Sequence, residues 1–174
     1  MVLNIHSDTS YLSESGACSR AGGYFYLSGA PQPSSTPSFN GAIFILSQII
    51  KNVLASGAEA ALGALIYNAR EATPIRITLT ELGHAQPTTP ITTDNACAAG
   101  IANATVKQKR SKAIDMRFYW IRDRVKQGQF CVRWAPGRMN RADYFTKHFW
   151  PAYHRAIRST YLQPTQQHTA TRVC

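Results

Sequence analysis

The segment from Val2 to Ser28, VLNIHSDTSYLSESGACSRAGGYFYLS, decides how the fold begins. It opens with a short apolar run, Val2 to Asp8, and closes with Gly22 to Ser28, which is rich in aromatic residues that favour β-strands. A third apolar run, Gly41 to Ser47, follows a loop over 29–40 that contains three prolines. Because consecutive strands with short connections usually lie side by side, this pattern predicts three antiparallel strands.

Downstream of residue 50 the chain alternates between helical and strand patterns. Alanine and leucine recur at helical spacing over 58–69, and Thr73 followed by Pro74 predicts the start of a second, short helix that ends at Gly83. The further predicted elements are a strand at 90–94, a helix from Asn95 to Asn103, a helix from Lys112 to Gln127 that Ser111 caps, a strand at 129–134, and a helix at 141–148 whose Asn140 and Asp143 resemble a capping box.

This order predicts an α/β domain with a mixed five-stranded sheet, three antiparallel strands followed by parallel ones, and helices on its faces. The domain is expected to cover residues 1–162. The polar tail at 163–174 is expected to be disordered.

Charge and composition narrow the class of function. The chain carries 19 Lys and Arg residues against 9 Asp and Glu residues, a net charge of +10. That excess favours nucleic acid as a partner, with an acidic membrane surface second, although a merely soluble basic protein would show the same balance. The four scattered cysteines form no CxxC pair, which argues against a zinc site or a disulfide framework. No secretory signal or membrane-spanning run is present, so we expect an intracellular protein, cytoplasmic or nuclear, without a membrane partner.

Three aspartates occur where such a fold can bring them together. Asp8 ends the first strand, Asp94 ends the fourth, and Asp143 lies in the first turn of the last helix. Each alone has an ordinary explanation as a turn, solvated or helix-dipole residue. Together they would repel one another unless cations neutralise them, and oxygen ligands without Cys or His select Mg²⁺ or Mn²⁺. We therefore expect a site for two divalent ions that act on a phosphodiester.

Several longer segments resemble the ribonuclease H domain that closes the Pol polyprotein of Ty1/copia-type retrotransposons. They run in family order from about Ile5 to Phe149 and read HSDTSYLSESGACSRAGGYFYLSG, NGAIFILSQIIKNVLASGAEAALGALI, TTDNACAAGIAN, RSKAIDMRFYWIRDRV and NRADYFTKHF. The resemblance implies an RNase H-like fold and Mg²⁺-dependent cleavage of the RNA strand of RNA–DNA hybrids. It makes Asp8, Asp94 and Asp143 the catalytic, metal-binding residues.

The resemblance also implies a partner, the reverse transcriptase domain of the same polyprotein. That domain is not part of this sequence. A polyprotein fragment, a truncated reading frame and a domesticated remnant therefore all stay open.

The fourth carboxylate of that family has no counterpart in this chain. The family reads Glu-Ala-Glu before a large apolar residue, with the second glutamate as a metal ligand, whereas this chain reads Glu59-Ala60-Ala61-Leu62. Glu59 lies roughly 200° around a regular helix from Ala61. We therefore expect Glu59 to be a first-turn glutamate that the helix dipole favours, not a substitute ligand.

Three functions stay open at this point. One is a retroelement ribonuclease H, either active or impaired by Ala61. Another is a module that binds the hybrid without cutting it, which Ala61 favours. The third is a different nuclease on the same fold, such as an exonuclease or an integrase core, against which the strings RSKAIDMR and ADYFTK argue.

Candidate nucleic-acid contacts lie outside the aspartates. The basic segment offers phosphate contacts through Lys107, Lys109, Arg110 and Lys112. Arg138 precedes Asp143 and could position the substrate. Asn95 could touch the sugars of the hybrid, although a helix cap needs no such role. His6 is expected to be structural.

Overall fold

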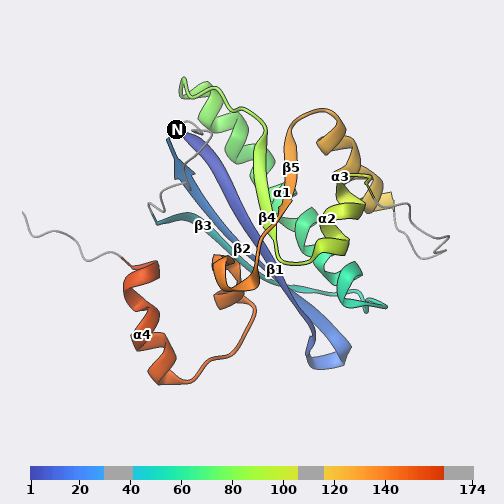
Figure 1. Ribbon diagram of the computed structural model, residues 1–174, viewed down its shortest axis with the longest axis vertical. Coiled ribbons are helices and arrows are strands. Elements are labelled where there is room, and N and C mark those ends of the chain that lie inside the picture. Colours follow the sequence, from blue (N-terminus) through green and yellow to red (C-terminus); the bar gives the residue numbers. More distant parts are fainter. Residues whose placement is uncertain (30–40, 106–115, 163–174) are drawn as a thin grey trace, which may run out of the picture.

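The protein is described here by a computed structural model, which places residues 1–29, 41–105 and 116–162. Its centre is a five-stranded sheet with the strand order β3-β2-β1-β4-β5 (Figure 1). The strands are β1 (Val2–Glu14), β2 (Cys18–Ser28), β3 (Ala42–Ile50), β4 (Thr89–Thr93) and β5 (Phe130–Trp134). Strands β1, β2 and β3 pair antiparallel, and β4 and β5 join parallel, which confirms the predicted mixed sheet.

Alternation along β2 separates two packing layers. Phe25 points into the main core, which also contains buried residues of α1 (Gly57–Glu81), α2 (Ala96–Ala102) and α3 (Met116–Lys126). Tyr24 and Tyr26 point to the opposite face, because successive side chains of a strand alternate. There they pack against Ala142, Phe145 and Tyr161, from η3 (Arg141–Phe145) and α4 (Pro151–Tyr161). Two further short 3₁₀ turns are η1 (Ser15–Ala17), between β1 and β2, and η2 (Gly137–Met139), between β5 and η3.

The prediction of two helices on either side of Thr73 and Pro74 is wrong, because α1 continues through both residues. A proline inside a helix cannot donate its usual backbone hydrogen bond. The Thr73 hydroxyl does not cap a new helix but donates to the carbonyl of Ala69, 2.9 Å away. The buried face of α1 runs past the proline to Leu79, so packing against the sheet outweighs the local signal for a break. Gly83, with φ 86°, follows the helix end as predicted.

The predicted helix at 141–148 is instead the short 3₁₀ turn η3, which ends at Phe145. Asn140 does cap it, since its side chain accepts a hydrogen bond from the Ala142 N–H at 3.1 Å. The predicted capping box is wrong, because the backbone N–H of Asn140 donates to the carbonyl of Gly137 and not to Asp143. Helix α4 is not predicted from the sequence.

Other predicted elements lie partly outside the described residues. This applies to the proline-containing loop from residue 30 to 40, to Ser111 and the start of the helix predicted from Lys112, and to the tail at 163–174. None of the helices in the described ranges combines the length and the apolar character that a membrane crossing needs.

Candidate carboxylate site

Asp8 lies in the central strand β1, opposite Gly22 of β2, and is only 6% exposed. Its carboxylate accepts a hydrogen bond from the hydroxyl of Thr146, which is also buried. Gly22 makes this contact possible. A Cβ at that position would lie 2.5 Å from Cγ2 of Thr146 and 3.0 Å from the carbonyl oxygen of Ala142. The absence of a side chain on β2 therefore lets the segment that carries Asp143 approach Asp8.

Two long-range hydrogen bonds hold that segment on β1. The side-chain amide of Asn140 donates to the carbonyl of Ser7 at 2.9 Å, and the backbone N–H of Arg141 donates to Nδ1 of His6 at 2.9 Å. Burial, assisted by the positive charge of Arg141, lowers the pKa of His6 to about 4. His6 is therefore a neutral acceptor at physiological pH, which supports its expected structural role. Both bonds place Asp143 beside the strand that carries Asp8.

Asp94 follows directly after β4, which pairs with β1, and it is exposed. Its backbone carbonyl accepts a hydrogen bond from the indole N–H of Trp134 at 3.0 Å. Gly137 lies close to its side chain, since a Cβ there would be 3.0 Å from Oδ2 of Asp94. The next residue, Asn95, caps α2 by accepting from the N–H of Ala98 at 2.9 Å, as predicted.

Electrostatics show that the three aspartates share one region. Burial is the largest cause that raises the pKa of Asp8, to about 6, and the negative charges of Asp94 and Asp143 raise it further. The hydrogen bond from Thr146 and the charge of Lys147 act in the opposite direction. The structure thus brings together the three carboxylates that the sequence singled out.

Lys147 is a member of this cluster that the sequence analysis missed. Its ammonium group forms an ion pair with the carboxylate of Asp143, four residues earlier. Burial lowers the pKa of Lys147, but the charges of Asp143, Asp8 and Asp94 outweigh it and the net change is upward. The spacing of four residues between Asp143 and Lys147 is the only signal in the sequence for this pair.

The carboxylates suit a hard divalent cation by their chemistry, but their side chains are not arranged as a ready-made set of ligands. Among residues 1–29, 41–105 and 116–162, no group of three or more His, Cys, Asp or Glu side chains is positioned to coordinate a metal ion. Three carboxylate donors and one competing ammonium therefore make an incomplete site for Mg²⁺ or Mn²⁺.

Ala61 occupies the buried face of α1 and is 5% exposed. Asn68, two helical turns later, lies on the same face. Its side-chain amide donates to Oγ of Ser7 and to the carbonyl of Gly22, both at 2.9 Å. Asn68 therefore fixes this face of α1 against β1 and β2, and at position 61 the face presents a methyl group to the main core. Asn68 is a second residue that the sequence analysis missed.

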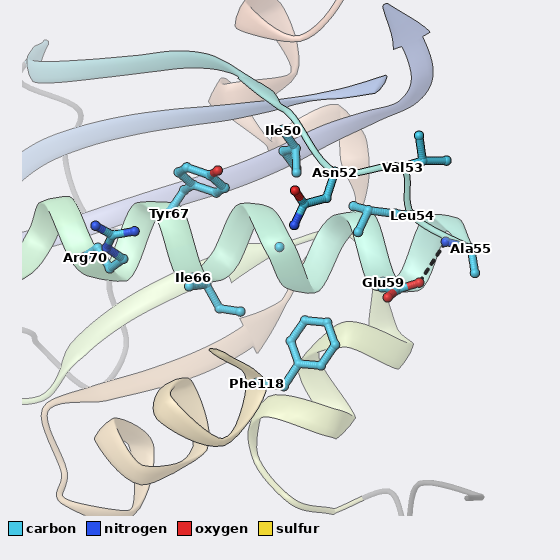
Figure 2. A pocket seen from close by; sticks show the side chains of 11 residues that line it. Ile50, Asn52, Val53, Leu54, Ala55, Glu59, Ile66, Tyr67, Arg70 and Phe118 are labelled. Atoms are coloured by element: carbon cyan, nitrogen blue, oxygen red, sulfur yellow. Dashed lines mark hydrogen bonds between the residues drawn. The ribbon is translucent and has the colours of Figure 1, made fainter. Parts of the chain in front are cut away.

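Glu59 does not join the aspartates. Its backbone N–H donates to Oγ of the N-cap residue Ser56 at 3.2 Å, and its carboxylate accepts from the N–H of Ala55 at 2.8 Å. Figure 2 shows this carboxylate at a cavity of about 280 Å³ whose other walls include Tyr67 and Phe118. None of the three aspartates lines that cavity. Glu59 thus stabilises the start of α1, as expected, and supplies no ligand to the carboxylate site.

The predicted nucleic-acid contacts have different outcomes. Lys107, Lys109, Arg110 and Lys112 lie outside the described residues. Arg138 is exposed in η2 and lines a cavity of about 140 Å³ together with Asp143. Asn95 is half-buried and serves as a helix cap.

No family model matches the sequence. Among solved structures, the N-terminal RNase H domain of rv2228c from Mycobacterium tuberculosis, solved as a fusion with maltose binding protein, is similar with a TM-score of 0.56 and 15% identity, over 83% of this chain and 90% of that chain. LC11-RNase H1, isolated from compost and solved in complex with an RNA/DNA hybrid, gives a TM-score of 0.57 and 14% identity, over 82% of this chain and 92% of that chain.

RNase H1 from the archaeon Halobacterium salinarum NRC-1 gives a TM-score of 0.51 and 15% identity, over 83% of this chain and 94% of that chain. Sequence identities this low establish the architecture and not the activity. The chain has an RNase H-like fold.

Proposed function

We propose that this chain is a retrotransposon-type ribonuclease H domain, of the Ty1/copia kind, that binds RNA–DNA hybrids and cleaves their RNA strand weakly. One observation carries the proposal: Asp94 and Asp143 both lie within electrostatic reach of the buried Asp8 on an RNase H-like fold. The excess of ten positive charges supports a nucleic-acid substrate. A similar protein, LC11-RNase H1, was solved with an RNA/DNA hybrid bound, which supports the choice of substrate class.

Different residues position the aspartates and bind the metal ions at this site. Thr146 holds the carboxylate of Asp8, and Asn140 with His6 holds the segment of Asp143. Divalent ions held by the three aspartates would supply an activated water and stabilise the leaving oxygen of the phosphodiester. Ala61 contributes no oxygen ligand, so we expect weak ion binding and slow cleavage.

The alternative is a module that binds the hybrid without cutting it. The ion pair between Lys147 and Asp143 favours it, because the ammonium already neutralises one of the carboxylates that a metal needs. Cleavage that requires a divalent ion and is abolished in Asp94→Asn would decide for the enzyme. Hybrid binding without any such cleavage would decide for the module.

The test of the proposal is a comparison of substrates at fixed salt concentration, because binding through phosphates depends steeply on salt. Fluorescence anisotropy would measure the affinity for a blunt RNA–DNA hybrid, double-stranded RNA and double-stranded DNA in EDTA. Cleavage of the same labelled duplexes would be followed in Mg²⁺ and in Mn²⁺. We expect the hybrid to bind most tightly and to be the only duplex cleaved. Equal affinity for the three duplexes together with no cleavage would refute the proposal.

A further inference from the structure

Helix α4 and the residue before it form an exposed surface of aromatic and cationic side chains. Trp150 is 84% exposed. Arg155 and Arg158 are exposed and lie three residues apart, so they neighbour each other on the helix. Helix α4 contains no acidic residue, and the sequence from Phe130 to Leu162 contains one, Asp143. The surface therefore suits a partner that carries negative charge.

The opposite side of α4 is already used for packing against the candidate site. Its Tyr161 ring stacks on Tyr144 with 4.7 Å between centroids, and its hydroxyl donates to the carbonyl of Arg141 at 3.0 Å. His154 and the Tyr144 hydroxyl form a hydrogen bond of 2.6 Å. Four residues of α4 line the cavity of about 140 Å³ beside Asp143: Tyr153, Ile157, Thr160 and Tyr161. The exposed surface thus belongs to a helix whose other side contacts the segment that carries Asp143.

We propose that Trp150, Arg155 and Arg158 bind unpaired nucleotides that extend from a hybrid held at the aspartates. This inference rests on the proposed function and adds a second part of the substrate to it. An exposed indole can stack on an unpaired base, whereas the bases inside a hybrid already stack on one another. The two arginines can contact successive phosphates of the same strand.

An acidic membrane surface would meet the same charges, but the packing of α4 argues against it. A helix that lies in a membrane interface inserts its apolar side. In α4 that side is taken up by Tyr161 and Ile157, which face η3 and the site. The free side presents two arginines and one indole, and this combination matches a single nucleic-acid strand better than lipid tails.

The experiment measures the affinity for a blunt hybrid, for the same hybrid with a single-stranded overhang of a few nucleotides, and for the single strand alone, all in EDTA. For the unmodified chain we expect the overhang to tighten binding. Trp150→Ala should reduce that gain by about 5- to 150-fold, the loss of stacking on one base. Arg155→Ala combined with Arg158→Ala should lower the salt dependence of single-strand binding by about 1.4 in the log–log slope, for two phosphate contacts.

The matched control is Lys51→Ala combined with Arg70→Ala, which removes two exposed cations from β3's end and from α1. It should leave the gain from the overhang unchanged. All substituted side chains are exposed, and thermal melting would verify that each variant is folded.

Two outcomes separate this inference from the proposed function. If the blunt hybrid binds but the overhang adds nothing, or adds as much in the Trp150 and double-arginine variants, the inference fails and the proposed function stands. If the blunt hybrid is not bound, the proposed function fails, and the affinity for the single strand alone tests the inference. Equal single-strand affinity of the unmodified chain, the Trp150 variant and the double-arginine variant would overturn the inference. A last measurement is the binding of each variant to vesicles that contain phosphatidylserine. Binding to them that requires Trp150, without any gain from the overhang, would assign the surface to membranes and overturn the inference.

Discussion

Replacing Asp8 with asparagine should stabilise the metal-free protein near neutral pH. Asp8 is buried, and its pKa is raised from 3.8 to about 6, first by burial and then by the neighbouring carboxylates. The folded protein therefore holds a proton between pH 4 and 6 that the unfolded chain has already lost, and above pH 6 the ionised carboxylate weakens the folded state. A change of this size corresponds to about 3 kcal/mol in the free energy of unfolding. Asparagine can still accept the hydrogen bond from Thr146 but carries no charge.

The assay is urea denaturation in EDTA at pH 4, 5, 6 and 7.5, with the difference in unfolding free energy between Asp8→Asn and the unmodified protein as the readout. We expect the variant to be more stable by about 3 kcal/mol at pH 7.5 and equally stable at pH 4. Asp123→Asn, at an exposed position of α3, serves as the control and should show no such dependence. If the difference in unfolding free energy between Asp8→Asn and the unmodified protein is the same at pH 7.5 as at pH 4, the electrostatic description of the site is refuted.

Two further substitutions probe how the site is assembled. Gly22→Ala should lower the free energy of unfolding by about 1–3 kcal/mol, because the new Cβ would meet Thr146. The control Gly29→Ala has open space around the new Cβ and should not lower it. Chemical denaturation of both variants measures the difference. His6→Asn should remove a loss of stability that acid causes in the unmodified protein. Burial and Arg141 lower the pKa of His6 to about 4, so the unfolded chain takes up the proton first as the pH falls below 6.5. The unmodified protein therefore loses about 3 kcal/mol of its free energy of unfolding by pH 4. Equal stability profiles of His6→Asn and the unmodified protein between pH 7 and 4 would contradict this.

Much of the fold could be predicted because local signals agree with the tertiary structure. Apolar runs and aromatic residues that favour β-strands identify the three antiparallel strands. Asn95 and Gly83 mark the limits of helices through capping and a positive φ angle. At Pro74 the local signal and the packing disagree. The apolar stripe of α1 continues on both sides of the proline, so burial against the sheet determines the outcome. A single sequence does not reveal which of the two effects is larger.

The candidate site was predictable for a different reason. The expectation that Asp8 ends its strand is wrong, because β1 continues to Glu14, but Asp8 still lies on the strand that pairs with β4. Asp94 directly follows β4, as predicted. The supporting residues could not be predicted in this way. Thr146 contacts Asp8 across 138 positions of the sequence, and Asn68 contacts Ser7 across 61. Such contacts depend on how η3 and α1 dock on the sheet, which no spacing within either segment reveals.

The most direct test of the proposed function concerns position 61. Cleavage of a labelled RNA–DNA hybrid in Mg²⁺ would be compared for the unmodified chain, Ala61→Glu and Ala61→Gln. The glutamine variant controls for the volume of the new side chain. We expect the glutamate variant alone to cleave faster, by on the order of tenfold or more, equivalent to about 1.4 kcal/mol or more of the barrier. Cleavage by the unmodified chain at the rate of Ala61→Glu, or an equal gain in Ala61→Gln, would contradict the account.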